Sequence, residues 1–376
     1  MRIAIVHDWL VTYAGAERVL EQMLSIFPEA DLYSTVDFLE DKSFILNKKV
    51  NTSFIQKLPF AKKNYRNYLP IMPWAVKRFD LSGYDLVISS SHAVAKGVIT
   101  NSDQCHICMC YTPMRYAWDL QDQYLRESGL DSGLKGVLAK FILARLREWD
   151  LRTVSNVDYF ISISDYISRR ILNVYRRSSK IIYPPVDVDA FMNPTAKKED
   201  FYITVSRLVP YKKVGLIVET FTQKFPDKKL FVIGDGPDFG RIKFTKGKNI
   251  TFLGHQPSHI VKDYMSRAKA FIYAADEDFG ISPLEAQASG TPVIAFGRGG
   301  CLETIVGLGN PSPTGVFFDE QTISSLTGAI RQFEKVEKKI LTKDCVENAT
   351  RFSVPRFKNE FKDFVFDVFT RWKSKE

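Results

Sequence analysis

The stretch that decides the fold is IIYPPVD, residues 181–187, which interrupts an otherwise regular pattern. On both sides of it, short apolar runs alternate with segments of helical spacing. The Pro-Pro pair at 184–185 stiffens the backbone and blocks helix formation, as a connection between domains would. A chain of 376 residues is also too long for one ordinary core. The break therefore predicts two domains, residues 1–184 and 185–354, followed by a terminal helix in 355–376.

The pattern around the break predicts the fold class. Before it, strands are expected at 3–6, 85–90, 106–111 and 159–163, with a first helix at 16–27. After it, the expected strands are 202–206, 230–233, 250–253, 270–275 and 292–296, and the expected helices are 214–225, 259–268, 283–289 and 323–333. Strands that alternate with helices form parallel sheets with right-handed crossovers. We therefore expect an α/β protein of two Rossmann-like, doubly wound domains that face each other across a cleft, with the Phe-rich C-terminal helix returning to the first domain.

Composition limits the class of protein and of partner. Hydrophobic residues make up 45% and charged residues 25% of the chain, a balance typical of a globular protein and not of a disordered one. The first residues, MRIAIVHDWL, have no signal-peptide pattern, no apolar run approaches a membrane span, and five cysteines in a long chain favour a reducing cytoplasm. The net charge of +9 predicts an anionic partner. Charge alone leaves nucleic acid, an anionic membrane surface and a phosphorylated metabolite open.

Two basic residues follow the first strand expected after the break. In SRLVPYKK, residues 206–213, Arg207 stands at the strand end and Lys212 near the next helix start. A guanidinium and an ammonium, together with the free amides of a helix N-terminus, make a suitable binding site for a diphosphate. The alternative is a solvated basic loop, which is what most charged residues form.

Two carboxylates flank a glycine turn in EDFGISPLE, from Glu277 to Glu285. Gly280 allows a ligand to approach the backbone, and the amides of Ile281 and Ser282 begin a helix whose N-terminus can face phosphate. Carboxylates repel phosphate and accept hydrogen bonds from hydroxyls, so Glu277 and Glu285 suggest a sugar on either side of a diphosphate. The alternative for Glu285 is a solvated position on the helix surface.

Arg207 with Lys212, and the segment from Glu277 to Glu285, resemble the donor-site motifs of the retaining glycosyltransferase family 4, whose members have the GT-B fold. The resemblance covers nearly the whole chain, including the Pro-Pro junction, GRGG at 297–300 and the returning C-terminal helix. It implies that Arg207 and Lys212 bind the donor diphosphate. It also implies that Glu277 contacts the transferred sugar and that Glu285 binds the ribose hydroxyls of the nucleotide.

Glycines and histidines at other strand ends complete the candidate site. The family usually has Gly-Gly where this chain has Ala14-Gly15, so the resemblance assigns donor binding to Gly15, although one glycine is also common in an ordinary strand-to-helix turn. Gly254, after the strand expected at 250–253, belongs to the donor-binding set. Family members often have a histidine that touches the transferred sugar, a role we expect for His92 here, with packing or capping as its alternative.

YTPMRY, residues 111–116, narrows the resemblance. Many members of the family have the sugar-contacting histidine here, whereas this chain has Tyr111, and this departure leaves the role of His92 open. Tyr111 and Arg115, with His7 after the first strand, are the expected acceptor-side residues. Together with SSSHAV before it, this segment resembles the mannosyltransferase branch of O-antigen and exopolysaccharide synthesis, which commonly uses GDP-mannose.

CHICMC at 105–110 has the composition of a metal site but is not predicted to be one. No second group of Cys and His lies nearby in the sequence to complete four ligands, so buried cysteines are expected. The resemblance also implies no cofactor, because the nucleotide sugar is a co-substrate. Arg207, Lys212 and the helix amides would neutralise its diphosphate without a metal.

Two segments combine basic and aromatic or apolar residues. Lys, Arg and aromatic residues alternate from 54 to 79, and Lys and Arg surround an apolar stripe from 134 to 149. A cationic amphipathic surface suits an anionic membrane, and an acceptor carried on a lipid would require such contact. We therefore expect peripheral contact with the inner face of the membrane, above all through the first segment. The alternative is that these helices only pack on the first domain.

The functional hypothesis is a cytoplasmic, metal-independent hexosyltransferase. It transfers a hexose, with mannose from GDP-mannose as the best match, to a glycan or lipid-linked glycan in bacterial surface polysaccharide synthesis, with retention at the anomeric carbon. A UDP- or ADP-sugar donor, and a phosphorylase or sucrose-type synthase of the same fold, are the alternatives among enzymes. A basic nucleic-acid-binding protein is the alternative from another class. The dispersed basic residues and the lack of a nucleic-acid motif argue against nucleic acid as a partner.

Overall fold

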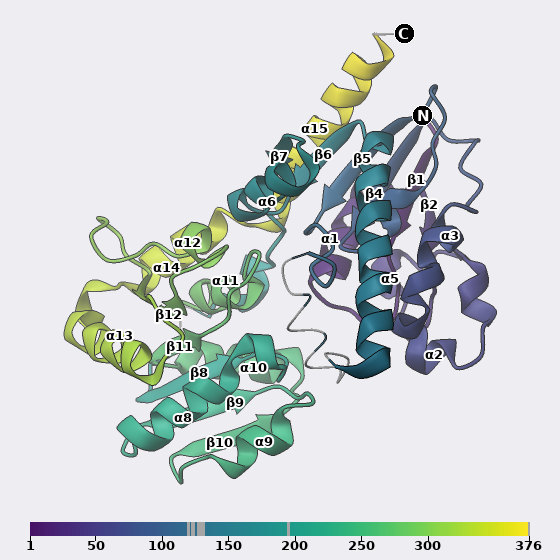
Figure 1. Ribbon diagram of the computed structural model, residues 1–376. Helices are drawn as coiled ribbons and strands as arrows, with labels where there is room; N and C mark the ends of the chain where they lie inside the picture. Colours follow the sequence, from purple (N-terminus) through teal and green to yellow (C-terminus); the bar gives the residue numbers. More distant parts are fainter. Residues whose placement is uncertain (119–120, 122–124, 126–131, 194–195, 375–376) are drawn as a thin grey trace. The chain divides into compact units, whose positions relative to one another are not determined.

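The chain forms two compact units (Figure 1). The computed structural model describes residues 1–118, 121, 125, 132–193 and 196–374. Unit 1 contains Met1–Tyr183 together with Phe357–Glu376, and unit 2 contains Pro184–Arg356. The division falls within IIYPPVD, between Tyr183 and Pro184. Each unit is a parallel α/β domain, so the predicted class of two Rossmann-like domains is confirmed.

The described part of unit 1 is built on a seven-stranded parallel sheet with the strand order β3-β2-β1-β4-β5-β6-β7. Its strands are β1 Ile3–His7, β2 Asp31–Ser34, β3 Val50–Thr52, β4 Leu86–Ser91, β5 Cys105–Cys110, β6 Tyr159–Ser162 and β7 Ser179–Ile181. The chain continues from β1 to β2 on one side and later returns to β4 on the other. The strand order therefore reverses between β1 and β4. Ligands bind at such switch points, outside the carboxyl ends of the strands.

Helices cover this sheet and share its core. They are α1 Gly15–Ile26, α2 Ala61–Asn64, α3 Met72–Val76, α5 Gly133–Arg152 and α6 Asp165–Tyr175. Leu146 of α5 and Met72 of α3 are buried in one hydrophobic cluster with Val87 of β4. The C-terminal helix α15, Val354–Lys373, belongs to unit 1 from Phe357 onward, as expected (Figure 1). Its buried residues are Phe357, Phe361, Val365, Val368 and Phe369.

Unit 2 repeats this plan with a six-stranded parallel sheet in the order β10-β9-β8-β11-β12-β13. Its strands are β8 Phe201–Val205, β9 Lys229–Ile233, β10 Ile250–Gly254, β11 Ala270–Tyr273, β12 Val293–Phe296 and β13 Gly315–Phe318. Strand β8 pairs with β9 on one side and with β11 on the other. The residues that follow β8 and β11 therefore lie at the switch point of this sheet.

The helices of unit 2 complete its two outer layers. They are α7 Val188–Phe191, α8 Val214–Lys224, α9 Phe239–Phe244, α10 Ser258–Arg267, α11 Ile281–Ala288, α12 Cys301–Thr304, α13 Ile323–Val336 and α14 Thr342–Thr350. Phe221 of α8 and Phe333 of α13 are buried in one cluster with Ile272 of β11. Val186 and Ser353 form a parallel bridge, which ties the beginning of unit 2 to its end.

The sequence does not predict four of the strands, β2, β3, β7 and β13. Strands β3 and β7 have three residues each, and none of these residues is fully buried, so they leave no apolar run. Strands β1 and β11, in contrast, are buried over their whole length. Such strands form continuous apolar runs, which is why their predicted bounds lie close to the observed ones.

Candidate functional site

The loop after β8 places Arg207 at the switch point of unit 2. This loop lies directly against the turn that follows β9. A Cβ on Gly234 would lie 1.9 Å from the carbonyl oxygen of Ser206. A Cβ on Gly236 would lie 2.3 Å from that of Leu208. Only glycine permits this approach, so Gly234 and Gly236 in the turn after β9 allow it to support the Arg207 loop. The Arg207 side chain is exposed.

Lys212 and Glu277 form an ion pair at the same switch point. Nζ of Lys212 lies 2.6 Å from Oε1 of Glu277, and each side chain is 17% exposed. Lys212 also donates a hydrogen bond to the hydroxyl of Tyr273 at 3.3 Å. Its ammonium lies 5.5 Å and 5.7 Å from the ring centroids of Tyr211 and Tyr273. The sequence predicts both charged residues but not their pairing, which arises because they follow the neighbouring strands β8 and β11.

Two glycines determine the backbone position of Glu277. The carbonyl oxygen of Glu277 accepts a hydrogen bond from Gly300 N at 2.8 Å. A Cβ on Gly299, whose φ is +64°, would lie 2.3 Å from that oxygen. A Cβ on Gly300 would lie 2.4 Å from Cα of Phe279. The GRGG motif thus has a physical reason, since its last two residues have to be glycine for the Glu277 loop to lie against them.

Helix α11 begins after Gly280, whose φ of +90° lies in the left-handed region. The backbone amides of Ile281 and Ser282 are the first of the helix, and such amides have no intrahelical acceptor. Pro283 follows them and has no amide hydrogen. Glu285 lies further along α11 with only 6% of its surface exposed. The alternative of a solvated helix position for Glu285 is therefore wrong.

The prediction of no metal overlooks an Asp-x-Asp pattern, Asp276 and Asp278, in the loop after β11. Nε of Arg298 lies 3.2 Å from a carboxylate oxygen of Asp276, and Asp278 is buried. Within the described ranges, no group of three His, Cys, Asp or Glu side chains is placed to hold a metal ion. Metal independence stays a prediction.

A buried polar network occupies the switch point of unit 1. Nδ1 of His7 lies 2.9 Å from Oγ of Ser90, which in turn lies 2.8 Å from the hydroxyl of Tyr111. Nε2 of His7 lies 3.4 Å from Oε1 of Glu17 in the first turn of α1. Both His7 and Tyr111 are buried. Their polar atoms contact protein groups, and the predicted contact of these two residues with an acceptor stays a prediction.

Asp8, next to His7, is a central residue of this site that the sequence does not predict. Its fully buried carboxylate accepts hydrogen bonds from four consecutive backbone amides, those of residues 92–95. Nδ1 of His92 lies 2.9 Å from Oδ2 of Asp8, and the His92 side chain is 27% exposed. Burial raises the pKa of Asp8, but the charge and hydrogen bonds of His92, together with the charge of His7, lower it to about 2.

Three other predicted residues lie at further loops and element ends. Gly15 is the first residue of α1, whose N-terminus is capped by a hydrogen bond from Ala14 N to Glu17 at 3.0 Å. Gly254 is the last residue of β10, and its φ is +68° with open space where a Cβ would lie. Arg115 is half-buried in the segment after β5. The ligand contacts of Gly15, Gly254 and Arg115 stay predictions.

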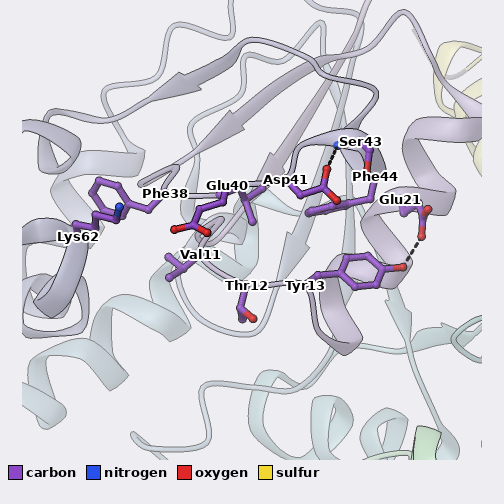
Figure 2. A pocket seen from close by; sticks show the side chains of 11 residues that line it. Val11, Thr12, Tyr13, Glu21, Phe38, Glu40, Asp41, Ser43, Phe44 and Lys62 are labelled. Carbon is purple, nitrogen blue, oxygen red and sulfur yellow. Dashed lines mark hydrogen bonds between the residues drawn. The ribbon is translucent and has the colours of Figure 1, made fainter. Parts of the chain in front are cut away.

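A groove of about 520 Å³ lies between the loops that follow β1 and β2 (Figure 2). The ring of Tyr13 lies 4.8 Å from that of Phe44, and its hydroxyl donates a hydrogen bond to Glu21 at 2.6 Å. The lining combines aromatic rings with carboxylates, namely Tyr13, Phe38, Phe44, Glu21, Glu40 and Asp41. The sequence does not predict this groove because β2 is not predicted. Its size is that of a small-molecule site.

The cysteines of β5 are buried, as expected. His106 on the same strand uses both ring nitrogens within the protein. Its Nδ1 lies 2.7 Å from the carbonyl oxygen of Asn156, and its Nε2 lies 2.9 Å from Oγ of Ser89. Burial lowers the pKa of His106 to about 4. His106 is therefore a neutral residue of the core.

Residues 187–352 match the family model of glycosyl transferases group 1. A GDP-mannose-dependent monoacylated alpha-(1-6)-phosphatidylinositol monomannoside mannosyltransferase of Corynebacterium glutamicum is 30% identical over 180 residues, 40% of this chain and 47% of that protein. The O-antigen chain mannosyltransferase RfbU of Salmonella typhimurium is 26% identical over 171 residues, 44% of this chain and 47% of that protein. The chain spans about half the length of the curated relatives it matches.

Solved structures share the fold over the whole chain. Anabaena HepE, in complex with UDP, superposes with a TM-score of 0.71 at 15% identity, covering 98% of this chain and 100% of that one. Sucrose-phosphate synthase of Thermosynechococcus elongatus superposes with a TM-score of 0.74 at 16% identity, covering 99% of this chain and 100% of that one. At these identities the likeness concerns the fold. The chain therefore has the GT-B fold, and its residues 187–352 match the model of the group 1 glycosyltransferases.

Proposed function

We propose that this protein is a retaining hexosyltransferase whose donor is a nucleotide diphosphate sugar. The observation that carries the proposal is the ion pair of Lys212 and Glu277 at the β8/β11 switch point, four residues before α11. A cation and free helix amides bind a diphosphate, and carboxylates bind hydroxyls. Unit 2 thus offers a complementary group to each part of such a donor.

The same groups fit a mechanism without a metal. Departure of the nucleotide leaves negative charge on the diphosphate, and Arg207, Lys212 and the first amides of α11 stabilise this charge as it grows. Glu277 orients the sugar through its hydroxyls, and Glu285 binds the ribose. The departing phosphate oxygen takes the proton of the acceptor hydroxyl. The new C–O bond forms on the face where the bond to phosphate breaks, so the anomeric configuration is retained.

The best-supported donor is GDP-mannose. The relative from Corynebacterium glutamicum is named as GDP-mannose-dependent, and RfbU is named as an O-antigen chain mannosyltransferase. These names support a place for this chain in the synthesis of a bacterial surface glycan. The likeness to HepE with UDP is one of fold at 15% identity, so UDP-sugars are the alternative that an experiment has to test.

A thermal-shift screen of the full chain with GDP-mannose, UDP-glucose, UDP-galactose and ADP-glucose tests the donor. A ligand at 100 times its Kd stabilises the folded state by about 2.7 kcal/mol. Stabilisation by GDP-mannose and not by the other sugars supports the proposal. Stabilisation by UDP-sugars alone overturns the choice of donor. Salt-sensitive binding of DNA, without a response to any sugar nucleotide, overturns the enzyme class.

The groove of Figure 2 is the acceptor subsite of this proposal. Aromatic rings such as the exposed Tyr13 pack on the apolar faces of sugars, and carboxylates accept hydrogen bonds from their hydroxyls. The three carboxylates in its lining outnumber its one ammonium group, that of Lys62, and this negative balance disfavours phosphate and favours a neutral glycan there. Tyr13→Ala is expected to raise the KM for a mannosyl acceptor and to leave the donor KM unchanged. An unchanged acceptor KM would place the acceptor elsewhere.

Helix α5 is the proposed site of membrane contact. Its residues at positions i, i+3, i+4 and i+7 form an apolar stripe that is between 57% and 90% exposed, namely Leu134, Val137, Leu138 and Phe141. Lys135, Lys140 and Arg145 lie on the same helix. An exposed apolar stripe with basic residues beside it suits the surface of an anionic membrane. The described helices include none that is long and apolar enough to span a membrane.

Co-sedimentation with vesicles of phosphatidylglycerol and phosphatidylethanolamine tests this contact. Leu138→Glu introduces a charge into the stripe and is expected to weaken binding several-fold. Leu172→Glu is the matched control, because Leu172 is similarly exposed on α6. Equal binding by the two variants would contradict the assignment to α5. In that case Phe60 and Trp74, both exposed in the 54–79 segment, are the next candidates.

A further inference from the structure

The loop after β4 is organised by the single carboxylate of Asp8. Oδ1 accepts hydrogen bonds from Val94 N at 2.6 Å and Ala95 N at 2.7 Å. Oδ2 accepts hydrogen bonds from His92 N at 2.6 Å and Ala93 N at 3.0 Å. Oδ2 also lies 2.9 Å from the ring nitrogen Nδ1 of His92. One buried carboxylate therefore holds the backbone of the loop through four hydrogen bonds and lies at ion-pair distance from the His92 ring.

The arrangement of the ring leaves its second nitrogen for a ligand. The ring of Trp9 packs edge-on against that of His92, with centroids 4.7 Å apart and an interplanar angle of 89°. Among the described residues, none forms a hydrogen bond with Nε2 of His92, and the side chain is 27% exposed. Because Nδ1 faces Asp8, Nε2 is the nitrogen that can reach a molecule bound at the switch point.

Charged groups from three elements surround this ring. Burial favours the neutral imidazole, but the carboxylates of Asp8, at the end of β1, and Glu17, on α1, raise the pKa of His92 above 6.5. Arg66, between α2 and α3, opposes them. His7 interacts with Glu17 and Asp8, and burial keeps Tyr111 a neutral phenol by raising its pKa. The balance of these charges favours a protonated His92.

We propose that Asp8 is a positioning residue that holds His92 with Nδ1–H toward its carboxylate, as an imidazolium whose Nε2–H donates a hydrogen bond to a ligand oxygen. His92 then acts as a charged donor and not as a base. This assignment rests on the proposed function, because the ligand oxygen belongs to the sugar nucleotide or to its acceptor. Beyond that function, the charge of His92 is assigned, and Asp8 is the residue that determines it.

The charge of His92 can be measured directly in the wild-type protein, with one variant used only to assign its resonance. NMR titration of the ¹⁵N-histidine-labelled full chain, with His92→Gln to assign the resonance, is expected to give a midpoint above 6.5. A midpoint at or below 6.5, or a ring that is neutral at pH 6, would overturn the proposal. This result does not depend on donor binding, so a failure of the proposed function would be seen separately in the sugar-nucleotide screen.

Two variants with opposite expected shifts test the role of Asp8. Asp8→Asn removes the negative charge at similar size, and the His92 midpoint is expected to fall by about one pH unit or more. Arg66→Gln removes the opposing charge, and the midpoint is expected to rise. The kcat/KM of the wild type is expected to fall as pH rises through the midpoint of His92. Asp8→Asn is expected to shift this fall to lower pH, and Arg66→Gln is expected to shift it to higher pH.

A purely structural role for Asp8 predicts a different result. Asp8→Asn would then lower stability but leave both the His92 midpoint and the pH profile of kcat/KM where they are, and this outcome would refute the assignment. If Asp8→Asn does not fold, the midpoint of His92 in the wild type and its shift in Arg66→Gln still show whether His92 is charged. Arg66 is exposed, so its replacement is expected to leave folding intact.

Discussion

At the scale of single residues, an ion pair organises each of the two switch points. Lys212 faces Glu277 at 2.6 Å in unit 2, and His92 faces Asp8 at 2.9 Å in unit 1. In each pair the partners follow adjacent strands of a parallel sheet. The charges are therefore compensated and held in place before a ligand binds, which limits the reorganisation that a reaction requires.

The two glutamates of the EDFGISPLE segment are expected to contribute to different steps. Glu277→Gln removes the carboxylate that holds Lys212 and orients the sugar, and kcat is expected to fall by about 10²–10³-fold. Glu285→Gln affects the ribose contact, so it is expected mainly to raise the KM for the donor. Steady-state kinetics with varied donor concentration measures both. Full turnover in Glu277→Gln, with none in Glu285→Gln, would reverse the two roles.

Lys96 is a buried cation with a structural function. Its Nζ lies 2.9 Å from Oδ1 of Asp150 and donates hydrogen bonds to the Asp150 carbonyl oxygen and to Oγ1 of Thr153, each at 2.6 Å. Lys96→Met leaves the Asp150 carboxylate buried without its cation, which is expected to cost about 3–5 kcal/mol of unfolding free energy. Urea denaturation measures this loss. Lys135→Met, on the exposed side of α5, is the control, and equal effects of the two would contradict this account.

The sequence predicts site residues where a motif is continuous along the chain. Glu277, Gly280 and Glu285 lie in one short segment, so their chemistry can be recognised directly. Asp8 cannot be predicted in this way, because it is 84 residues away from the amide of His92 that it binds. Its role depends on the pairing of β1 with β4, which only the folded sheet provides.

At the scale of elements, the sequence predicts the strands that carry the two switch points, β1, β4, β8 and β11. Each contains an apolar run and is almost wholly buried. The groove of Figure 2 depends on the loop after β2, which belongs to a missed strand. The site residues in continuous motifs after β8 and β11 could therefore be predicted, whereas the groove beside the unpredicted strand β2 could not.

Gly300, in the loop after β12, has to be glycine because the Glu277 loop packs against its backbone. In Gly300→Ala the new Cβ would lie 2.4 Å from Cα of Phe279, so the Glu277–Phe279 backbone has to shift. We expect a loss of about 1–3 kcal/mol in stability and weaker binding of the donor, measured by denaturation and calorimetry. Gly328→Ala, in the open on α13, is the control and is expected to stabilise by about 0.5–1 kcal/mol. Donor affinity unchanged in Gly300→Ala would contradict the role of this glycine.

At the scale of the whole molecule, the two units contain parallel sheets whose first four strands have the same order. Both sheets place their fourth strand beside their first, so each unit has one switch point and one set of site residues. This repetition could be predicted because the alternation of strands and helices stops at the Pro-Pro pair and then restarts. The return of α15 to unit 1 is expected from its Phe-rich sequence, and not from the alternation of strands and helices.

Removal of α15 is expected to affect unit 1 selectively. A chain that ends at Arg356 lacks Phe357, Phe361, Val365 and Val368, which are fully buried. Each such side chain contributes about 1.5–3 kcal/mol through burial, so the unfolding of unit 1 is expected at a lower temperature. Hydrogen exchange resolved by peptide is expected to lose protection in β1, β5 and β6 while β8 and β11 keep it. Equal loss in both sheets would contradict the assignment of α15 to unit 1.

The most direct test of the central claim is calorimetric titration of the protein with GDP-mannose, in the wild type and in Lys212→Met. We expect saturable binding to the wild type and a loss of affinity of at least about tenfold in the variant, because hydrogen bonds from a cation to the diphosphate contribute about 1.5–3 kcal/mol. Lys213→Met, its exposed neighbour, is expected to bind like the wild type. Equal affinity in the wild type and Lys212→Met would contradict a donor site at the β8/β11 switch point.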